Sequence, residues 1–411
     1  MLQPLSGDVV LARSNWRERG ILGILFMMNF CHMVDFVIIM PLGPQLMRTF
    51  QISTQQFSLL VSAYAISAGI MGLFAAFFTD RFDRKKTMLF VYTGFTVGTL
   101  LCALAPSFQL LLLARVIAGA FGGVISATAL AMIGDVIPFE RRGAAIGVVM
   151  SAFAIASVVG IPLGLKTVML WSWHGPFMML VILSCVILLA AQKILPPVRA
   201  HLQTEIKKSS WQEFITVLRN PVYQRAYCMT STLSISGFLI IPYISAYAVF
   251  NVKVPESDLL WIYFFGGLFT FFSTNLIGKL TDRYGSFRML AIVNLLSIIP
   301  TLLLTHIGEI HMGVFLMITT LFMMGTSGRF TPAMNLMHSI VSSPQRGAFM
   351  GMSFAFQQIS AASAAYVAGI IIQQTADQTL IHYNWAGFIS MGFVLISFGL
   401  AYSLRQYSKR R

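Results

Sequence analysis

The stretch Thr79-Asp80-Arg81-Phe82-Asp83-Arg84-Lys85-Lys86 lies between two apolar runs, residues 57–78 and 87–104. Each run has about the ~20 residues that a helix needs to cross a bilayer. Charged residues at this density are not stable in hydrocarbon, so a tight polar turn at a membrane face is expected here. The sequence therefore predicts two membrane-spanning helices joined by a short charged loop.

A second copy of this turn occurs in the other half of the chain. Thr281-Asp282-Arg283-Tyr284-Gly285-Ser286-Phe287-Arg288 repeats the Asp-Arg-aromatic core, again between apolar runs, at an offset of 282 − 80 = 202 residues in a chain of 411. Pro41 and Pro242 repeat at nearly the same offset, as do the Arg-Gly-Ala triplets that begin at Arg142 and Arg346. A two-fold internal repeat in a membrane chain is typical of secondary transporters.

Composition and charge placement support a membrane protein. Hydrophobic residues make up 57% of the chain and charged residues 10%, against about 25% charged in soluble domains. The net charge is +14, but the loops assigned to one side of the membrane hold only Arg48 and Lys253. This asymmetry predicts that both termini are cytoplasmic. The positive charge therefore indicates topology, and nucleic-acid binding is not expected. The four cysteines all lie in apolar runs, so no disulfide framework, metal site or cofactor is expected.

The hydropathy pattern predicts an all-α membrane protein with twelve transmembrane helices in two pseudo-symmetric six-helix halves. The expected spans are 20–46, 56–79, 86–105, 109–136, 143–166, 172–195, 221–250, 258–281, 287–306, 311–340, 346–375 and 383–405. The expected domains are a cytoplasmic segment (1–19), an N-terminal half (20–195), a cytoplasmic linker (196–220), a C-terminal half (221–405) and a basic tail (406–411). Within the linker, residues 211–218 are expected to form a short interfacial helix.

The charged turn resembles the signature loop of the major facilitator superfamily, G-x-x-x-D-R-x-G-R-R, between its second and third spans. Here the glycine positions hold Ala76 and Asp83, and the charged positions are matched by Asp80, Arg81, Arg84 and Lys85. The second copy keeps both glycines, Gly278 and Gly285, and departs at the final basic pair. The resemblance covers essentially the whole chain and implies alternating access between two halves. It also implies that these loops latch the cytoplasmic ends of the halves together in the outward-facing state. The residues expected in this cytoplasmic gate are Asp80, Arg81, Arg84, Lys85, Asp135, Arg142, Asp282 and Arg283.

Two further patterns resemble the exporters of that family. Asp35 precedes a Pro-x-x-Pro pattern, Pro41-Leu42-Gly43-Pro44, as in first spans of drug and sugar exporters. Gly160, Pro162 and Gly164 partly match the fifth-span pattern G-P-x-x-G-G, which the family associates with antiport. Generic helix packing is an alternative interpretation of these glycines.

Asp35 is the principal candidate for chemistry because it lies within the first span. A carboxylate there costs several kcal/mol unless it faces a cavity, finds a partner or takes up a proton. Asp35 is therefore a candidate proton carrier, with His32 three residues earlier on the same helical face. A structural carboxylate bonded to a neighbouring helix is the alternative.

Two arginines within spans are further candidates. Arg115 matches the fourth-span arginine that the family is thought to use in proton movement, and snorkelling to the outer interface is the alternative. Arg329 lies near the middle of the tenth span, which lines the central cavity in the family. It could bind an anion or pair with a carboxylate, or serve structurally at a helix carbonyl end. The other expected cavity residues are Asn29, Tyr64, Tyr243, Asn335 and Gln357.

These observations predict a proton-coupled exporter of a small organic solute in the inner membrane of a bacterium. Asp35 would carry the proton, and Arg115 and Arg329 would tune its protonation or hold an anionic substrate group. The expected partners are a small-molecule substrate, protons and membrane lipid, and the chain is expected to act as a monomer. A proton-driven importer of sugars, amino acids or nucleosides stays open, as does a non-transporting receptor or scaffold on the same fold. No nucleotide-binding loop or nucleophile–base set suggests an enzyme.

Overall fold

The computed structural model describes residues 16–78, 81–199, 211–342 and 345–410. Within these ranges the protein is almost entirely helical, and its strands form one short antiparallel hairpin of β1 (Gln373–Gln374) and β2 (Leu380–Ile381). The helices of the N-terminal half are α1 (Trp16–Ile38), α2 (Gly43–Phe50), α3 (Thr54–Phe78), α4 (Arg84–Ala103), α5 (Phe108–Val136), α6 (Phe139–Met150), α7 (Ala152–Ile155), α8 (Ile161–Trp171) and α9 (Gly175–Ile194). Those that follow are α11 (Trp211–Arg219), α12 (Pro221–Phe238), α13 (Ile244–Phe250), α14 (Leu259–Tyr284), α15 (Ser286–His306), α16 (Met312–Gly328), α17 (Phe330–Ile340), α18 (Arg346–Ile371) and α19 (Tyr383–Arg410).

The number of membrane crossings agrees with the sequence pattern. Eleven helical segments of the described ranges are long and apolar enough to span a membrane. One of them, Glu140–Ile194, has 55 residues, about twice the length that one crossing needs. It turns back at Ser172–His174, so it supplies two crossings and brings the total to the expected twelve.

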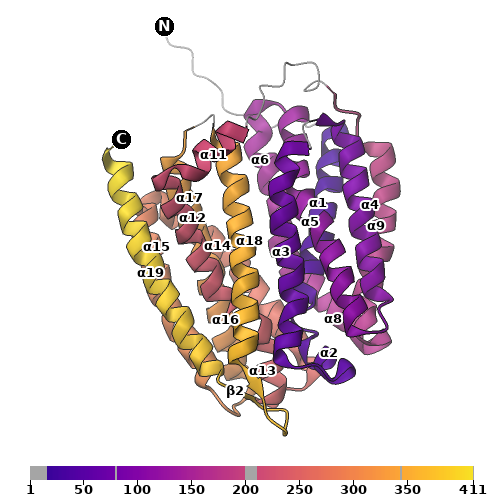
Figure 1. The fold of residues 1–411 in the computed structure, drawn as a ribbon, viewed down its shortest axis with the longest axis vertical. Helices are drawn as coiled ribbons and strands as arrows, with labels where there is room; N and C mark the ends of the chain where they lie inside the picture. The colour runs from indigo at the N-terminus through magenta and orange to yellow at the C-terminus, as the bar shows by residue number, and fades with distance from the viewer. Residues whose placement is uncertain (1–15, 79–80, 200–210, 343–344, 411) are drawn as a thin grey trace.

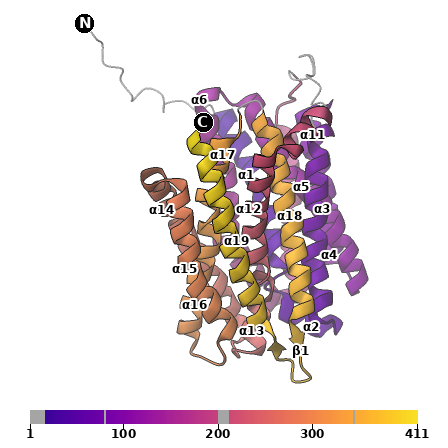
Figure 2. The same cartoon turned by 60° about the vertical axis from the view of Figure 1, so that its left-hand side comes forward.

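The helices form two bundles that stand side by side (Figure 1). The N-terminal half, in indigo to magenta, contacts the C-terminal half along α3 and α18, which run next to each other in both views (Figures 1 and 2). The first turn of α1 meets α6 through an ion pair between Glu18 and Arg141, and α19 ends at this same end of the bundle. We call it the termini end. The opposite end, with α2, α13 and the β-hairpin, is the hairpin end (Figure 2).

The internal repeat reappears as two equivalent helix breaks. The first span, expected as one helix, stops at Ile38 and resumes at Gly43, and the seventh stops at Phe238 and resumes at Ile244. Pro41 and Pro242 lie in the two breaks. Proline lacks an N–H donor and its ring clashes with the preceding turn, which favours a break at both positions.

Two more spans are irregular. In the fifth span, residues 156–160 form a π-helix in which Ile161 N–H donates to the Ala156 carbonyl. Pro162 follows directly and has no N–H for the regular helical ladder, which accounts for the shifted register. In the tenth span, the helix is interrupted at Arg329, between α16 and α17, three residues before Pro332.

Polar side chains join the two halves at the hairpin end. Arg48 and Glu256 form an ion pair across the halves, Tyr243 Oη donates to the Thr54 carbonyl at 2.8 Å, and Thr54 Oγ1 donates to the Ile372 carbonyl at 2.6 Å. The main hydrophobic core is continuous across both halves. A second cluster belongs mostly to helices of the C-terminal half towards the termini end. These contacts join the two halves at the hairpin end, and we call them the hairpin-end seal.

Candidate transport site

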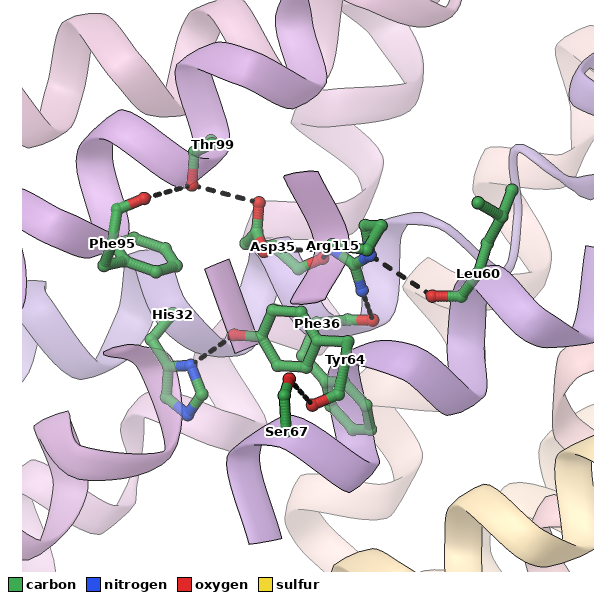
Figure 3. A network of polar contacts seen from close by, with 9 residues as sticks. All are labelled: His32, Asp35, Phe36, Leu60, Tyr64, Ser67, Phe95, Thr99 and Arg115. Atoms are coloured by element: carbon green, nitrogen blue, oxygen red, sulfur yellow. Dashed lines mark hydrogen bonds and ion pairs between the residues drawn. The ribbon is translucent and has the colours of Figure 1, made fainter. Parts of the chain in front are cut away.

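A fully buried ion pair lies where α1 breaks (Figure 3). Asp35 is on the last turn of α1 and Arg115 on α5, and both side chains have 0% exposure. Arg115 Nη1 is 3.0 Å from Asp35 Oδ2. Because each ion would be costly alone in this environment, the two charges depend on each other. Arg115 therefore does not snorkel to a membrane face, and Asp35 has a partner on a neighbouring helix.

The broken end of α1 supplies further acceptors for Arg115. Nη1 donates to the Asp35 carbonyl at 2.9 Å, Nη2 to the Phe36 carbonyl at 3.4 Å, and Nε to the Leu60 carbonyl on α3 at 3.4 Å. In an uninterrupted helix the carbonyls of residues 35 and 36 would accept from the next turn. The break frees them, so one guanidinium holds three helices of the N-terminal half together.

Tyr64 and His32 extend this site towards the termini end. The Tyr64 ring lies under the Arg115 guanidinium, 4.2 Å from its Cζ, and its hydroxyl is 2.7 Å from His32 Nδ1. Gly122 makes this arrangement possible, since a Cβ there would lie 2.5 Å from the Tyr64 hydroxyl. Thr99 Oγ1 also donates to Asp35 Oδ1 at 3.3 Å. The three residues expected to couple protons, Asp35, His32 and Arg115, thus belong to one network with Tyr64 and Thr99.

Aromatic rings join this network to the other half. Phe36 stacks on Tyr64 with ring centroids 5.3 Å apart, and its other neighbour is Phe238 at 6.0 Å. Phe238 is the last residue of α12, directly before the break in the seventh span. Phe36 and Phe238 therefore form a packed contact between the Asp35 network and the C-terminal half.

Arg329 lies in the C-terminal half, between α16 and α17, and is 2% exposed. Its Nη2 donates to the Leu233 carbonyl of α12 at 3.1 Å, whereas its Nε has no hydrogen-bond partner among the described residues. Within the same part of the chain Arg329 forms no ion pair with a carboxylate. The Leu233 carbonyl belongs to α12, so Nη2 of Arg329 makes a contact with the backbone of its own half, whereas Nε–H has no acceptor in the part of the chain that the structure describes.

The other expected cavity residues are distributed through the protein. Asn29 is buried and accepts from Ser126 Oγ at 2.7 Å, between α1 and α5. Tyr243 is buried in the hairpin-end seal, bonded to Thr54. Asn335 on α17 is half-buried, and so is Gln357 on α18, whose amide donates to Ser353 Oγ at 3.0 Å. Asn29 therefore lies in the N-terminal half near the network, whereas Tyr243 belongs to the contact between halves.

The loop residues expected in the gate contact mainly their own half. Arg84 pairs with Asp135 at 2.9 Å, Lys85 Nζ donates to the Gln192 carbonyl at 2.7 Å, and Arg142 Nε donates to the Ile137 carbonyl at 2.9 Å.

The remaining gate residues are exposed or lie outside the described part of the chain. Arg81 and Asp282 are exposed, Arg283 lies over the Tyr284 ring, and Asp80 lies outside the described residues. That these loops contact mainly their own half agrees with two halves that are joined at the hairpin end.

Asp83, which occupies a glycine position of the resembled motif, has a role that the sequence did not indicate. It caps α4 by accepting from Lys85 N–H at 2.9 Å and accepts from Arg199 Nε at 2.8 Å and Val198 N–H at 3.3 Å. Burial by itself raises the pKa of this carboxyl. The hydrogen bonds from Arg199, Val198 and Lys85 outweigh it and leave the pKa below its ordinary value. Asp83 thereby fixes the start of the linker between the halves to the loop before α4.

The fifth-span glycines serve close packing. A Cβ at Gly160 would lie 2.2 Å from Val34 Cγ2, and one at Gly164 would lie 2.8 Å from Ile38 Cδ1. Span five therefore presses against the end of α1 that carries Asp35. Across the halves, Gly267 of α14 approaches the π-helix, where an added Cβ would lie only 2.8 Å from the Ser157 carbonyl carbon. Pro162 and these glycines thus place an irregular helix between the Asp35 break and the C-terminal half.

The fold, the repeat and the buried pair define a secondary transporter of the two-bundle kind. A profile of the Major Facilitator Superfamily matches residues 25–328, and the chain belongs to this family. Two proteins of Bacillus subtilis (strain 168) align over nearly its whole length. The uncharacterized MFS-type transporter YceJ is 25% identical, covering 94% of this chain and 97% of its own. Multidrug resistance protein 2 is 22% identical, covering 92% and 93%.

Solved structures agree on the fold. A bacterial homolog of the human lysosomal transporter Spinster, in an inward-facing and occupied conformation, superimposes with a TM-score of 0.75 at 14% identity over 96% of this chain and 98% of that one. The nucleoside transporter NupG gives 0.74 at 15% identity, over 94% and 98%. The chain is thus a multi-pass membrane transporter of the Major Facilitator Superfamily.

Proposed function

We propose that this protein exports a small organic solute in exchange for protons, with Asp35 as the proton carrier. The observation that carries the proposal is the Asp35–Arg115 pair, fully buried at a helix break beside the interface of the halves. Protonation of Asp35 would remove one charge of the pair and release Arg115 to its carbonyl acceptors alone. Because both groups hold α1 to α5, the change would alter the packing of the span that breaks there.

The network offers a path for this proton. Asp35 has no exposed surface in the described conformation, so it must exchange protons in another one or through neighbouring groups. Tyr64 and His32 extend from Arg115 towards the termini end, joined by a hydrogen bond of 2.7 Å. Both side chains can accept and donate a proton, and we propose that they connect Asp35 with the termini end.

The proposal makes two further assumptions, one about orientation in the membrane and one about coupling. The first is that the excess of positive charge at the termini end puts that end in the cytoplasm, in the inner membrane of a bacterium. With the seal at the hairpin end, the described conformation would then be inward-facing. The second is that the contact of span five with Gly267 of α14, through the π-helix beside the Asp35 break, shifts when a proton binds.

The test is proton movement in liposomes that contain the purified protein. A pH dye inside the liposomes is followed while metabolites and drugs are added one at a time. With wild type, we expect at least one compound to enter the liposomes while protons leave, or to leave while protons enter. Asp35→Asn should show no such exchange. Asp377→Asn, the same substitution at an exposed carboxylate near the hairpin, is the matched control and should behave as wild type.

The outcomes separate the rival functions. Protons that move in the same direction as the compound would identify an importer of the symport type and overturn the export proposal. Gradient-driven accumulation that survives in Asp35→Asn would overturn the assignment of Asp35 as carrier. Compound movement without any proton movement would identify a uniporter.

A further inference from the structure

Two arginines, Arg115 and Arg329, are buried within the spans, and their surroundings differ. Arg115 has a carboxylate, three backbone carbonyls and an aromatic ring around its guanidinium. Arg329 has a single backbone carbonyl, and its buried Nε–H has no acceptor among the described residues. A buried charge without a counter-ion is unstable, and an unpaired buried donor adds to that cost. Such a site is expected to be retained for a ligand that completes it.

The position of Arg329 suits a ligand site. It lies at the interruption of the tenth span, ~26 Å along the helix from Met312 and ~17 Å from Ile340, close to the middle of the span at 1.5 Å per residue. The facing residue of α12 is Gly237, where a Cβ would lie 3.6 Å from Arg329 Nη2. The next residue is Phe238, which contacts Phe36 of the first span. Arg329 therefore packs against α12 one residue before Phe238, the residue that contacts the Asp35 network through Phe36.

We propose that Arg329 binds the carboxylate of an organic monoanion with an apolar body, an inference that rests on the proposed transport function and specifies its substrate class. Nε–H and the second hydrogen of Nη2 form a planar fork that matches the two oxygens of a carboxylate. One unpaired guanidinium neutralises one charge, which favours a monocarboxylate over a phosphate ester carrying two. Phe238 and Phe36 supply apolar surface for the rest of the molecule.

The experiment measures ligand-dependent thermal stability of the purified full-length protein in lipid nanodiscs. The probes are benzoate and octanoate, their neutral analogues benzamide and octanamide, and phenyl phosphate. We expect a saturable rise in Tm with the carboxylates and none with the amides. Loss of the charge-assisted pair in Arg329→Gln should weaken carboxylate binding at least about tenfold. Arg329→Lys, which keeps the charge without the fork, should bind less tightly than wild type and more tightly than Arg329→Gln.

Several results would overturn the proposal. These are equal responses to acid and amide in wild type, no response to any carboxylate, or carboxylate selectivity that persists in Arg329→Gln. An equal response to phenyl phosphate would overturn the restriction to monocarboxylates.

Stability without ligand gives a second, independent readout. Arg329→Met removes an uncompensated charge, so its Tm should equal or exceed that of wild type, whereas Arg115→Met should lower Tm. A similar drop in both variants, or loss of folded protein in Arg329→Met, would show that Arg329 is structural. Benzoate binding to wild type in nanodiscs is measured without a proton gradient, so it does not depend on proton coupling. If proton coupling fails while benzoate binds through Arg329, only the proposed function is wrong.

Discussion

The strongest stability prediction concerns the dependence of Asp35 and Arg115 on each other. The variants are Asp35→Asn, Arg115→Met and the double substitution. The single changes are unequal, because Asp35→Asn leaves Arg115 with the Asp35, Phe36 and Leu60 carbonyls and the Tyr64 ring. Arg115→Met leaves the Asp35 carboxylate with the Thr99 hydroxyl, so it should be the more damaging.

The magnitude follows from the burial of the pair. Both side chains are 0% exposed and their charged atoms are 3.0 Å apart. Removing one partner of a buried pair costs about 3–5 kcal/mol, and replacing both by neutral groups costs much less. We therefore expect a coupling free energy of about 3 kcal/mol between the two sites, compared with at most about 1 kcal/mol for an exposed pair.

The assay is equilibrium unfolding in mixed micelles with increasing SDS, followed by circular dichroism at pH 7 for all four proteins. The cycle isolates the pairwise free energy because each single change removes the same interaction. A coupling free energy below about 1 kcal/mol would refute the reasoning, since the pair would then be no stronger than one at the surface. Single variants that both match wild type would refute it as well.

Two further predictions concern packing and pH. Gly123→Ala should lower Tm, because its Cβ would lie 2.2 Å from the Ala68 carbonyl oxygen on α3, an overlap of the kind that costs about 1–3 kcal/mol. The control is Gly134→Ala in the same helix, whose Cβ meets nothing within 4 Å and which should keep or raise Tm. Equal effects of the two substitutions would contradict the close α3–α5 contact. The hydrogen bonds that lower the Asp83 pKa should make wild type more stable than Asp83→Asn at pH 7 and at pH 5, above the ordinary carboxyl pKa of 3.8. This difference in Tm should shrink as the pH falls through the depressed folded-state pKa, and a difference that instead grows in acid would show that the sign of the shift is wrong.

Much of the architecture could be predicted because membrane burial leaves a clear pattern in the composition of a chain. Long apolar runs between charged turns indicated the crossings, and the duplicated Asp-Arg-aromatic turn indicated the two halves. The prolines at Pro41 and Pro242 lie where the first and seventh spans break, although those spans were expected to be continuous. A break depends on where the freed carbonyls find donors, and the donor for α1 is Arg115, 80 positions away from Asp35.

The site was only partly predictable. Asp35, His32 and Arg115 are conspicuous because ionisable groups in apolar runs need a reason. Thr99 and Phe36 carried no such signal, since threonine and phenylalanine are ordinary in a span. The sequence did not indicate the bond that Tyr243 makes to the Thr54 carbonyl of the other half. Asp83 was noted as a missing glycine, and only the folded loop shows it capping α4 and holding Arg199.

The membrane class, the two-fold repeat and the few charged residues that chemistry could use follow from residue types alone, because a charged side chain is costly to desolvate wherever it lies in the chain. The tertiary structure decided how those charges are partnered. Arg115 and Arg329 are equally unfavourable as isolated residues in hydrocarbon. The packing of α1 against α5 brings a carboxylate to Arg115, whereas the packing of α12 against the tenth span brings Arg329 one carbonyl and leaves its Nε unpaired among the described residues. Partners distant in sequence are set by helix packing, and pairing decides whether a buried charge is structural or available to a ligand.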